Sequence, residues 1–314
     1  MKTILVLTDF SESARNAADA AIIIAEAIKA DIILLNAFVI ATMMVTTEPM
    51  PWPLEYYKIL EQDSIDQLKL EQDRLVEQTL KKDSADHKIN ISTMSRGGSL
   101  SDGLAYALKH EDIIMVTMGG RHNKGSELLF GSDIMDVINN ANRPVFINSV
   151  IKLSSSAKNV VFATDLSHED VNGLNYVISL SKYFGFHIHV CHVADNAPES
   201  TTSHHSNHIS EFENKIDRSK LSCLSFNELK GNHIKDELTK YSNAIDADIL
   251  ILTHKKHSFF WRMVHETPAT DLVKIHKQPL LILPCSNDPA FFQSFLPLHS
   301  FIPDASNYSS ANTD

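Results

Sequence analysis

The sequence predicts an α/β protein made of two tandem domains, each a doubly wound parallel sheet with helices on both faces. The first observation is an internal repeat, because ILVLTDFS at residues 4–11 recurs as VVFATDLS at residues 160–167, displaced by 156 positions. In both copies, short apolar runs typical of strands covered on both faces alternate with segments of helical periodicity. Strands that alternate with helices at this spacing indicate a parallel sheet.

The repeat extends through both halves of the chain. LLNAF at residues 34–38 aligns with VCHVA at residues 190–194 without a gap. RPVFIN at residues 143–148 matches QPLLIL at residues 278–283 at a displacement of 135 positions. The second copy is therefore about 21 residues shorter than the first, mostly in its middle.

The elements of the first copy follow from apolar spacing and from cap and turn residues. Ser11 or Ser13 is expected to cap the first helix, and Ser167 with Asp170 gives a comparable cap signal in the second copy. The excursion at residues 40–53 holds three prolines and is expected to be irregular. The predicted strands are 4–8, 31–38, 87–93, 112–118 and 144–150, and the predicted helices are 14–28, 56–82, 100–108 and 132–140.

The composition and the position of linker-like segments divide the chain into four parts. We expect a first domain over residues 1–151, a linker over 152–158 with the sequence KLSSSAK, and a second domain over 159–286. Residues 287–314 form a polar tail with an aromatic island, FFQSFLPLHSF, which is expected to be partly disordered or draped over the second domain.

Charge and cysteine content narrow the class of partner and the compartment. The formal net charge is −11 and we find no basic patch, which disfavours nucleic acid and anionic membrane surfaces as partners. No apolar run approaches the roughly 18 residues of a membrane-spanning helix. The three cysteines are odd in number and far apart, which favours a reducing compartment. We therefore expect a soluble cytoplasmic protein.

The glycine-rich stretch TMGGRHNKGSELLFGSD, residues 117–133, follows a predicted strand and is the candidate ligand loop. In an open α/β sheet, ligands bind beyond the carboxyl ends of the strands where the strand order switches direction. Gly131 and Ser132 open a helix whose N-terminal amides favour an anion such as phosphate. Asp9, at the end of the first strand, is placed to accept hydrogen bonds from a ribose or a base edge.

These residues together resemble the universal stress protein family, here as a tandem over residues 1 to about 286. The resemblance rests on V-L-T-D-F-S near the start, the glycine-rich loop, G-S before a helix and the closing R-P-V strand. It implies a Rossmann-like, adenine nucleotide alpha hydrolase-like fold, and many members with the motif G-x2-G-x9-G-[ST] bind ATP. By the same resemblance Asp9 is the first-strand aspartate, Ala37 lies against the base, Gly119 is the first motif glycine, and Gly131 with Ser132 is the last pair.

The loop of the first copy departs from the family motif. His122 stands where the second glycine belongs, and Gly119 to Gly131 is twelve steps where the motif requires thirteen. Gly120 or Gly125 is the candidate replacement for the missing glycine. Two alternatives stay open: a first domain that binds ATP, with or without magnesium, and a vestigial loop.

The loop of the second copy departs further. Counting back from Pro279 puts Glu266 where Gly131 falls and Thr267 where Ser132 falls, while His254 and Lys255 stand near the position of Gly119. A carboxylate at a helix N-terminus would occupy the place of a phosphate and repel it. The second half is therefore predicted not to bind ATP.

Histidines and serines raise metal and hydrolase hypotheses that the spacing does not favour. His187 and His189 lie on one face of a predicted strand and His192 on the other, so these three do not converge on one ion, and we predict no metal site. Adventitious zinc binding by His204, His205 and His208 in the following loop stays open. No G-x-S-x-G elbow occurs. We therefore predict no catalytic residues and at most slow ATP hydrolysis.

Two classes of function remain. The first is a stress-response or regulatory protein in which an adenine nucleotide bound by the first domain changes the surface offered to an unknown protein partner. The second is a scaffold or interaction protein in which both sites are degenerate. Because single-domain members of the family commonly dimerise through their last strands, we expect PVFINSV and PLLILP to pair within this chain as an internal pseudo-dimer. Whether a further homodimer forms stays open, with the excursion around Trp52 and the aromatic tail as candidate contacts.

Overall fold

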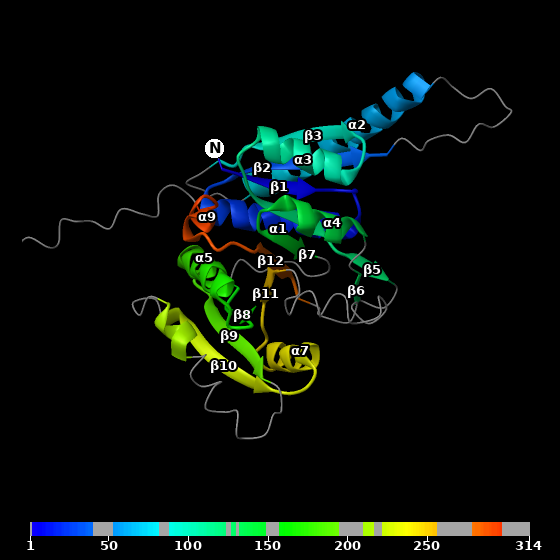
Figure 1. The fold of residues 1–314 in the computed structure, drawn as a ribbon. Coiled ribbons are helices and arrows are strands. Elements are labelled where there is room, and N and C mark those ends of the chain that lie inside the picture. Colours follow the sequence, from blue (N-terminus) through cyan, green and yellow to red (C-terminus); the bar gives the residue numbers. More distant parts are fainter. Residues whose placement is uncertain are drawn as a thin grey trace, which may run out of the picture.

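The computed structural model contains one continuous sheet of ten strands that runs through both halves of the chain (Figure 1). It describes residues 2–39, 53–81, 88–123, 127–129, 132–148, 157–194, 210–216, 222–255 and 278–296. The strand order is β10-β9-β8-β11-β12-β7-β4-β1-β2-β3, and neighbouring strands are parallel except for β12 and β7. The predicted α/β fold class with mostly parallel strands is confirmed.

The described residues of the first half form seven strands, of which five join the large sheet. Its elements are β1 (Thr3–Leu7), α1 (Glu12–Ile28), β2 (Asp31–Phe38), α2 (Pro53–Leu80), β3 (Ile91–Gly97), α3 (Leu100–His110), β4 (Ile113–Gly119), the short pair β5 (Arg121–Asn123) and β6 (Glu127–Leu129), α4 (Ser132–Ala141) and β7 (Val145–Asn148). From β1 the chain adds β2 and β3 on one side and β4 and β7 on the other. The strand order therefore switches direction between β1 and β4.

The second half repeats this arrangement with fewer residues. Its elements are β8 (Asn159–Ala163), α5 (His168–Phe184), β9 (His187–Ala194), β10 (Leu224–Lys230), α7 (Ile234–Ala244), β11 (Ile249–His254), β12 (Leu280–Pro284) and the short helix α9 (Pro289–Gln293). The corresponding switch lies between β8 and β11.

The two halves join through their last strands. β7 and β12 pair antiparallel, with Val145 opposite Ile282, Phe146 opposite Leu281 and Ile147 opposite Leu280. This is the intrachain pairing expected from the sequence. Each of these strands would otherwise be an open edge, so their pairing removes two edges that could recruit another chain.

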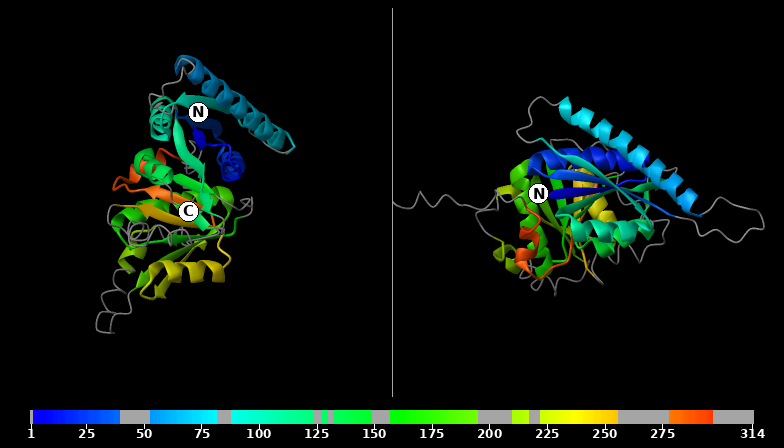
Figure 2. Two further views of the ribbon diagram at one scale, coloured as in Figure 1. Left: turned by 90° about the vertical axis from the view of Figure 1, so that its right-hand side faces the viewer. Right: turned by 90° about the horizontal axis from the view of Figure 1, so that it is seen from above.

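Helices cover both faces of the sheet, and each face carries its own apolar core. On one face, side chains of α1, α2 and α5 pack on alternate strand residues such as Val6 and Phe162. On the other, side chains of α3, α4 and α7 pack on the intervening residues such as Leu5 and Val161. Seen from above, the strands of the first half run between α1 and α2 on one side and α3 on the other (Figure 2). No helix in the described ranges is long and apolar enough to cross a membrane.

A side-chain hydrogen bond caps the start of α1 but not the start of α5. Ser11, rather than Ser13, caps α1, since its hydroxyl oxygen accepts the Ala14 N–H at 3.2 Å. The expected cap by Ser167 is absent, because no side-chain hydrogen bond from this residue caps α5. Its hydroxyl instead meets a lysine from another part of the second half, as described below.

The start of the polar tail packs back onto the body of the protein. Phe292 of α9 lies on Tyr176 of α5, with ring centroids 5.4 Å apart, and Phe295 is buried beneath the Arg143 guanidinium. Lys2 donates a hydrogen bond to the Ser294 carbonyl. Residues 289–296 therefore lie against both halves of the chain, and residues 297–314 lie outside the described part.

Candidate functional site

The turn after β1 holds its polar groups by short local hydrogen bonds. The Phe10 N–H donates to Thr8 Oγ1 at 3.0 Å, and the Ser11 N–H donates to Asp9 Oδ1 at 3.1 Å. Phe10 has a φ of 63°, a left-handed conformation that is strained for a bulky residue. Strain of this kind persists where the surroundings dictate it, and here it leaves the Asp9 side chain exposed at the end of β1.

A cavity of about 330 Å³ opens beside Asp9 at the carboxyl ends of β1, β2 and β4. This volume lies at the small end of the range of small-molecule sites, and the cavity sits at the switch in strand order where open α/β sheets bind ligands. Three of the predicted site residues, Asp9, Ala37 and Gly119, lie together in its wall. The complete set of lining residues is Leu7, Thr8, Asp9, Ser13, Ala14, Asn36, Ala37, Val39, Ser99, Leu100, Met118, Gly119, Asp133 and Ile134.

The structure shows a packing reason for Gly119. A Cβ atom at this position would lie 2.5 Å from the Ser13 carbonyl carbon and 2.6 Å from the Ala14 nitrogen. Only glycine therefore allows β4 to end against the first turn of α1. This close approach explains the glycine without any phosphate.

The other glycines of the candidate loop are less informative. The Gly120 N–H donates to the Asn148 carbonyl at 3.3 Å, so this amide extends the pairing of β4 with β7. Gly125 and Gly131 lie outside the described residues, and Ser132 is described only as the first residue of α4. Whether these residues cradle a phosphate stays a prediction.

A buried chain of hydrogen bonds behind the cavity was not anticipated from the sequence. Asn36 Nδ2 donates to the Thr8 carbonyl at 2.7 Å, Ser64 Oγ donates to Asn36 Oδ1 at 2.8 Å, and Ser95 Oγ donates to Ser64 Oγ at 2.7 Å. The chain links β1, β2, α2 and β3 and fixes the polar wall of the cavity. A polar Asn36 inside the apolar run DIILLNAF was the available signal, because buried polar groups require partners.

Three helices begin at the rim of this cavity. Ser13 and Ala14 belong to the first turn of α1, Leu100 begins α3, and Asp133 lies in the first turn of α4. Helix N-termini carry partial positive charge and favour anions. Among the lining residues that the structure describes, however, Asp9 and Asp133 are acidic and none is Lys, Arg or His.

The turn after β8 has the same geometry as the turn after β1. The Leu166 N–H donates to Thr164 Oγ1 at 2.8 Å, the Ser167 N–H donates to Asp165 Oδ1 at 3.1 Å, and Leu166 has a φ of 62°. His192 takes the place of Asn36, since its Nδ1 lies 3.0 Å from the Thr164 carbonyl oxygen. The two turns therefore correspond in their individual hydrogen bonds.

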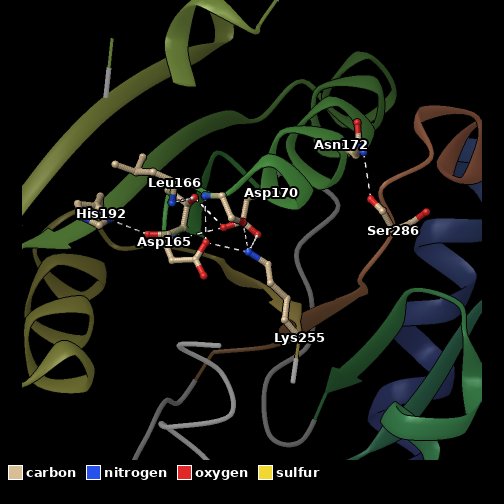
Figure 3. A network of polar contacts seen from close by, with 9 residues as sticks. Asp165, Leu166, Asp170, Asn172, His192, Lys255 and Ser286 are labelled. Carbon is tan, nitrogen blue, oxygen red and sulfur yellow. Dashed lines mark hydrogen bonds and ion pairs between the residues drawn. The ribbon is translucent and has the colours of Figure 1, made fainter. Parts of the chain in front are cut away.

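Unlike the turn after β1, the turn after β8 is occupied by a lysine side chain. Lys255, directly after β11, extends toward the turn after β8, where its Nζ lies 2.8 Å from Asp165 Oδ1 and 2.8 Å from Asp170 Oδ1 (Figure 3). It also donates a hydrogen bond to Ser167 Oγ. The Lys255 side chain is 11% exposed and that of Asp170 only 3%.

The ion pairs set the protonation states of this cluster. Burial opposes ionisation of Asp165, but the hydrogen bond and charge of Lys255 outweigh it and lower the pKa of Asp165 to about 2. Burial likewise opposes the charge of Lys255, and the two carboxylates outweigh it and raise the Lys255 pKa. Burial also raises the pKa of Asp170 above its ordinary value, although the charge of Lys255 opposes this. Asp165 and Lys255 are therefore the two groups held in their charged forms at neutral pH.

Among the described residues, a small cavity lies beside Asp165. Its volume is about 50 Å³, and it is lined by Ala163, Thr164, Asp165, Cys191, His192, Val193, Ile234 and Leu238. Glu266 and Thr267, on which the sequence prediction for this half partly rested, lie outside the described residues.

The histidines of β9 contact each other and a tyrosine and do not form a metal site among the described residues. His187 and His189 stack edge to face with ring centroids 4.8 Å apart, and His189 Nδ1 lies 3.1 Å from the Tyr241 hydroxyl. Within the described ranges no group of three His, Cys, Asp or Glu residues is placed to hold a metal. His204, His205 and His208 lie outside those ranges.

Fold and site together define a tandem α/β protein with one open cavity at a strand-order switch and one filled counterpart. The model of the family described as "Universal stress protein family" matches residues 1–148. Residues 1–148 therefore belong to the universal stress protein family, as the sequence resemblance implied, and the second half repeats the same architecture.

Solved structures agree with this assignment at the level of the fold. A universal stress protein from Archaeoglobus fulgidus DSM 4304 is 15% identical with a TM-score of 0.62, and the match covers 90% of this chain and 98% of that chain. A putative universal stress protein from Pseudomonas aeruginosa UCBPP-PA14 is 13% identical with a TM-score of 0.58, covering 93% of this chain and 95% of that chain. Both matches extend across the two halves. No curated protein sequence matches the chain.

Proposed function

We propose that the first domain binds an adenine nucleotide, ATP or a close relative, in the cavity beside Asp9, and that the chain acts as a nucleotide-responsive stress or regulatory protein. The observation that carries this proposal is the cavity of about 330 Å³ at the strand-order switch of the family domain. Its place in the fold is where this class of sheet binds nucleotides.

The lining residues suggest how the nucleotide would lie. Asp9 is exposed to the cavity, and a carboxylate accepts hydrogen bonds from the N–H groups of a base or the hydroxyls of a ribose. Ala37 leaves a low apolar wall where a base can lie. The phosphates would then point toward the first turns of α1 and α4, where backbone amides favour anions.

The acidic rim adds a requirement for a cation. Asp9 and Asp133 line the cavity and no basic side chain does so among the described lining residues, so phosphates bound there would be repelled unless a cation accompanies them. We therefore expect the nucleotide to bind as its magnesium complex, with weaker binding after chelation of magnesium.

The alternative is a scaffold protein whose first site is vestigial. Two observations favour it: packing against α1 requires Gly119, and the Gly120 amide pairs within the sheet. Both glycines are thus explained without a bound phosphate.

Calorimetric titration with ATP and magnesium separates the two alternatives. Binding with micromolar affinity that Asp9→Ala weakens about 10-fold to 100-fold supports a nucleotide site, since a hydrogen bond to a charged acceptor contributes about 1.5–3 kcal/mol. Asp165→Asn is the matched control at the end of β8, and it should leave the affinity unchanged. No heat and no thermal shift at millimolar ATP would establish the scaffold alternative. Equal losses in both variants would mean that the ligand does not sit beside Asp9.

A further inference from the structure

The cluster around Lys255 has the composition of an occupied ligand site. We propose that Asp165, Ser167 and Asp170 form a binding site for a primary ammonium group, and that Lys255 is its built-in ligand. The second domain is then held permanently in a filled state. This inference does not depend on nucleotide binding by the first domain.

The ammonium group of Lys255 lies among three oxygen atoms of the turn after β8 and the start of α5. Its Nζ forms ion pairs with Asp165 Oδ1 and Asp170 Oδ1 at 2.8 Å each, and it donates a hydrogen bond to Ser167 Oγ. Asp170 is itself held in place, because its Oδ2 accepts the Thr164 hydroxyl at 2.7 Å and the Asp165 N–H at 3.1 Å. Asp170 is therefore positioned by hydrogen bonds that do not involve Lys255, as an acceptor in a ligand site would be.

The internal repeat shows what is special to the second domain. At the displacement of 156 positions Asp170 corresponds to Ala14, and at the displacement of 135 positions Lys255 corresponds to Gly120. The buried carboxylate and its cation thus appear together in one copy and are both absent from the other, whereas the turns that carry Asp9 and Asp165 share their hydrogen bonds. This is the pattern expected if the two charges form one unit.

Among the described residues, the filled site goes together with a smaller cavity. The first cavity extends over the end of β4 and the first turn of α1, around Ala14 and Gly119, while the second retains only the part beside β8, β9 and α7. Its volume is about 50 Å³ instead of about 330 Å³. The Lys255 ammonium is already paired with Asp165 and Asp170, so it is not free to neutralise an incoming phosphate.

Chemical rescue tests the proposal on the full chain. Lys255→Ala removes an n-propylammonium group from between two carboxylates and should lower the melting temperature at pH 7 by about 5–10 °C, because it leaves buried charge unpaired. Added n-propylammonium should restore part of this loss in a saturable way. Tetramethylammonium has the same charge but no N–H, so it should not restore it.

A double variant gives the matched control. Lys255→Gly with Asp170→Ala installs the residue pair of the first domain, removes both charges, and should lose less stability than Lys255→Ala while showing no response to n-propylammonium. An unchanged melting temperature for Lys255→Ala, or equal responses to the two cations, would overturn the proposal.

A measurement on the unmodified protein keeps the test independent of variant folding. Acetylation of lysines under native conditions, mapped by mass spectrometry, should be at least about 10-fold slower at Lys255 than at the exposed Lys29, since a largely buried ammonium paired with two carboxylates is both shielded and held protonated. Equal rates at the two lysines would refute a permanently bound ammonium group.

Discussion

Replacing Gly119 with alanine tests whether packing alone requires this glycine. The added Cβ would lie 2.5 Å and 2.6 Å from backbone atoms of Ser13 and Ala14, and 2.8 Å from the Ser13 carbonyl oxygen. Backbone atoms cannot rotate away as a side chain does, so either the end of β4 or the first turn of α1 must shift. Overpacking of this kind costs about 1–3 kcal/mol, and contact with backbone places Gly119→Ala at about 2–3 kcal/mol.

The assay is urea unfolding followed by far-UV circular dichroism, with Gly103→Ala as the matched control. A Cβ at Gly103 would lie 3.2 Å from Leu35 Cδ2 and 3.7 Å from Ala37 Cβ, contacts that a leucine side chain can adjust to. Because alanine is favoured over glycine inside a helix by about 1 kcal/mol, Gly103→Ala should be neutral or slightly stabilising. A loss below about 0.5 kcal/mol for Gly119→Ala would refute the packing explanation, since that is the range of neutral substitutions.

Two further predictions concern the charged cluster. The stability gap between the wild type and Lys255→Met should be about 3 kcal/mol at pH 7. The folded-state pKa of Asp165 is about 2, below its unfolded value of about 3.9, so this stabilisation is present above about pH 4 and is lost as the pH falls toward 2; a gap that widens on acidification, measured by thermal unfolding, contradicts it. The double variant Ala14→Asp with Gly120→Lys places the counterparts of Asp170 and Lys255 in the first domain. It should abolish the heat of ATP binding in a folded protein. Unchanged affinity would argue that this ion pair does not block a nucleotide site.

Much of the fold could be predicted from the sequence because its determinants are local. Apolar runs of strand length, helical spacing of alanines in α1 and the repeat at 156 positions are properties of neighbouring residues. The pairing of β7 with β12 followed from the family resemblance. The position of Asp9 beside a cavity was also predictable, because parallel strands bring their carboxyl ends to one edge of the sheet.

Other features could be found only in the tertiary structure. The glycine spacing suggested a phosphate loop, yet the need for Gly119 comes from the backbone of α1, more than a hundred residues earlier in the chain. Asn36 in β2 is held by a hydrogen bond from Ser64 of helix α2, and the sequence around Ser64 carries no sign of this contact.

The ion-pair cluster of the second half shows most clearly what the sequence determined and what only the tertiary structure decided. By itself, the sequence determined that the two halves share a fold and that their ligand loops differ, since both follow from comparing aligned residues. Only the tertiary structure decided that Lys255 meets Asp165 and Asp170, because the partners of an ion pair are brought together by the strand order of the sheet. Contacts between residues about 90 positions apart leave no periodic pattern along the chain. The partners of Lys255 could therefore be identified only once the fold was known.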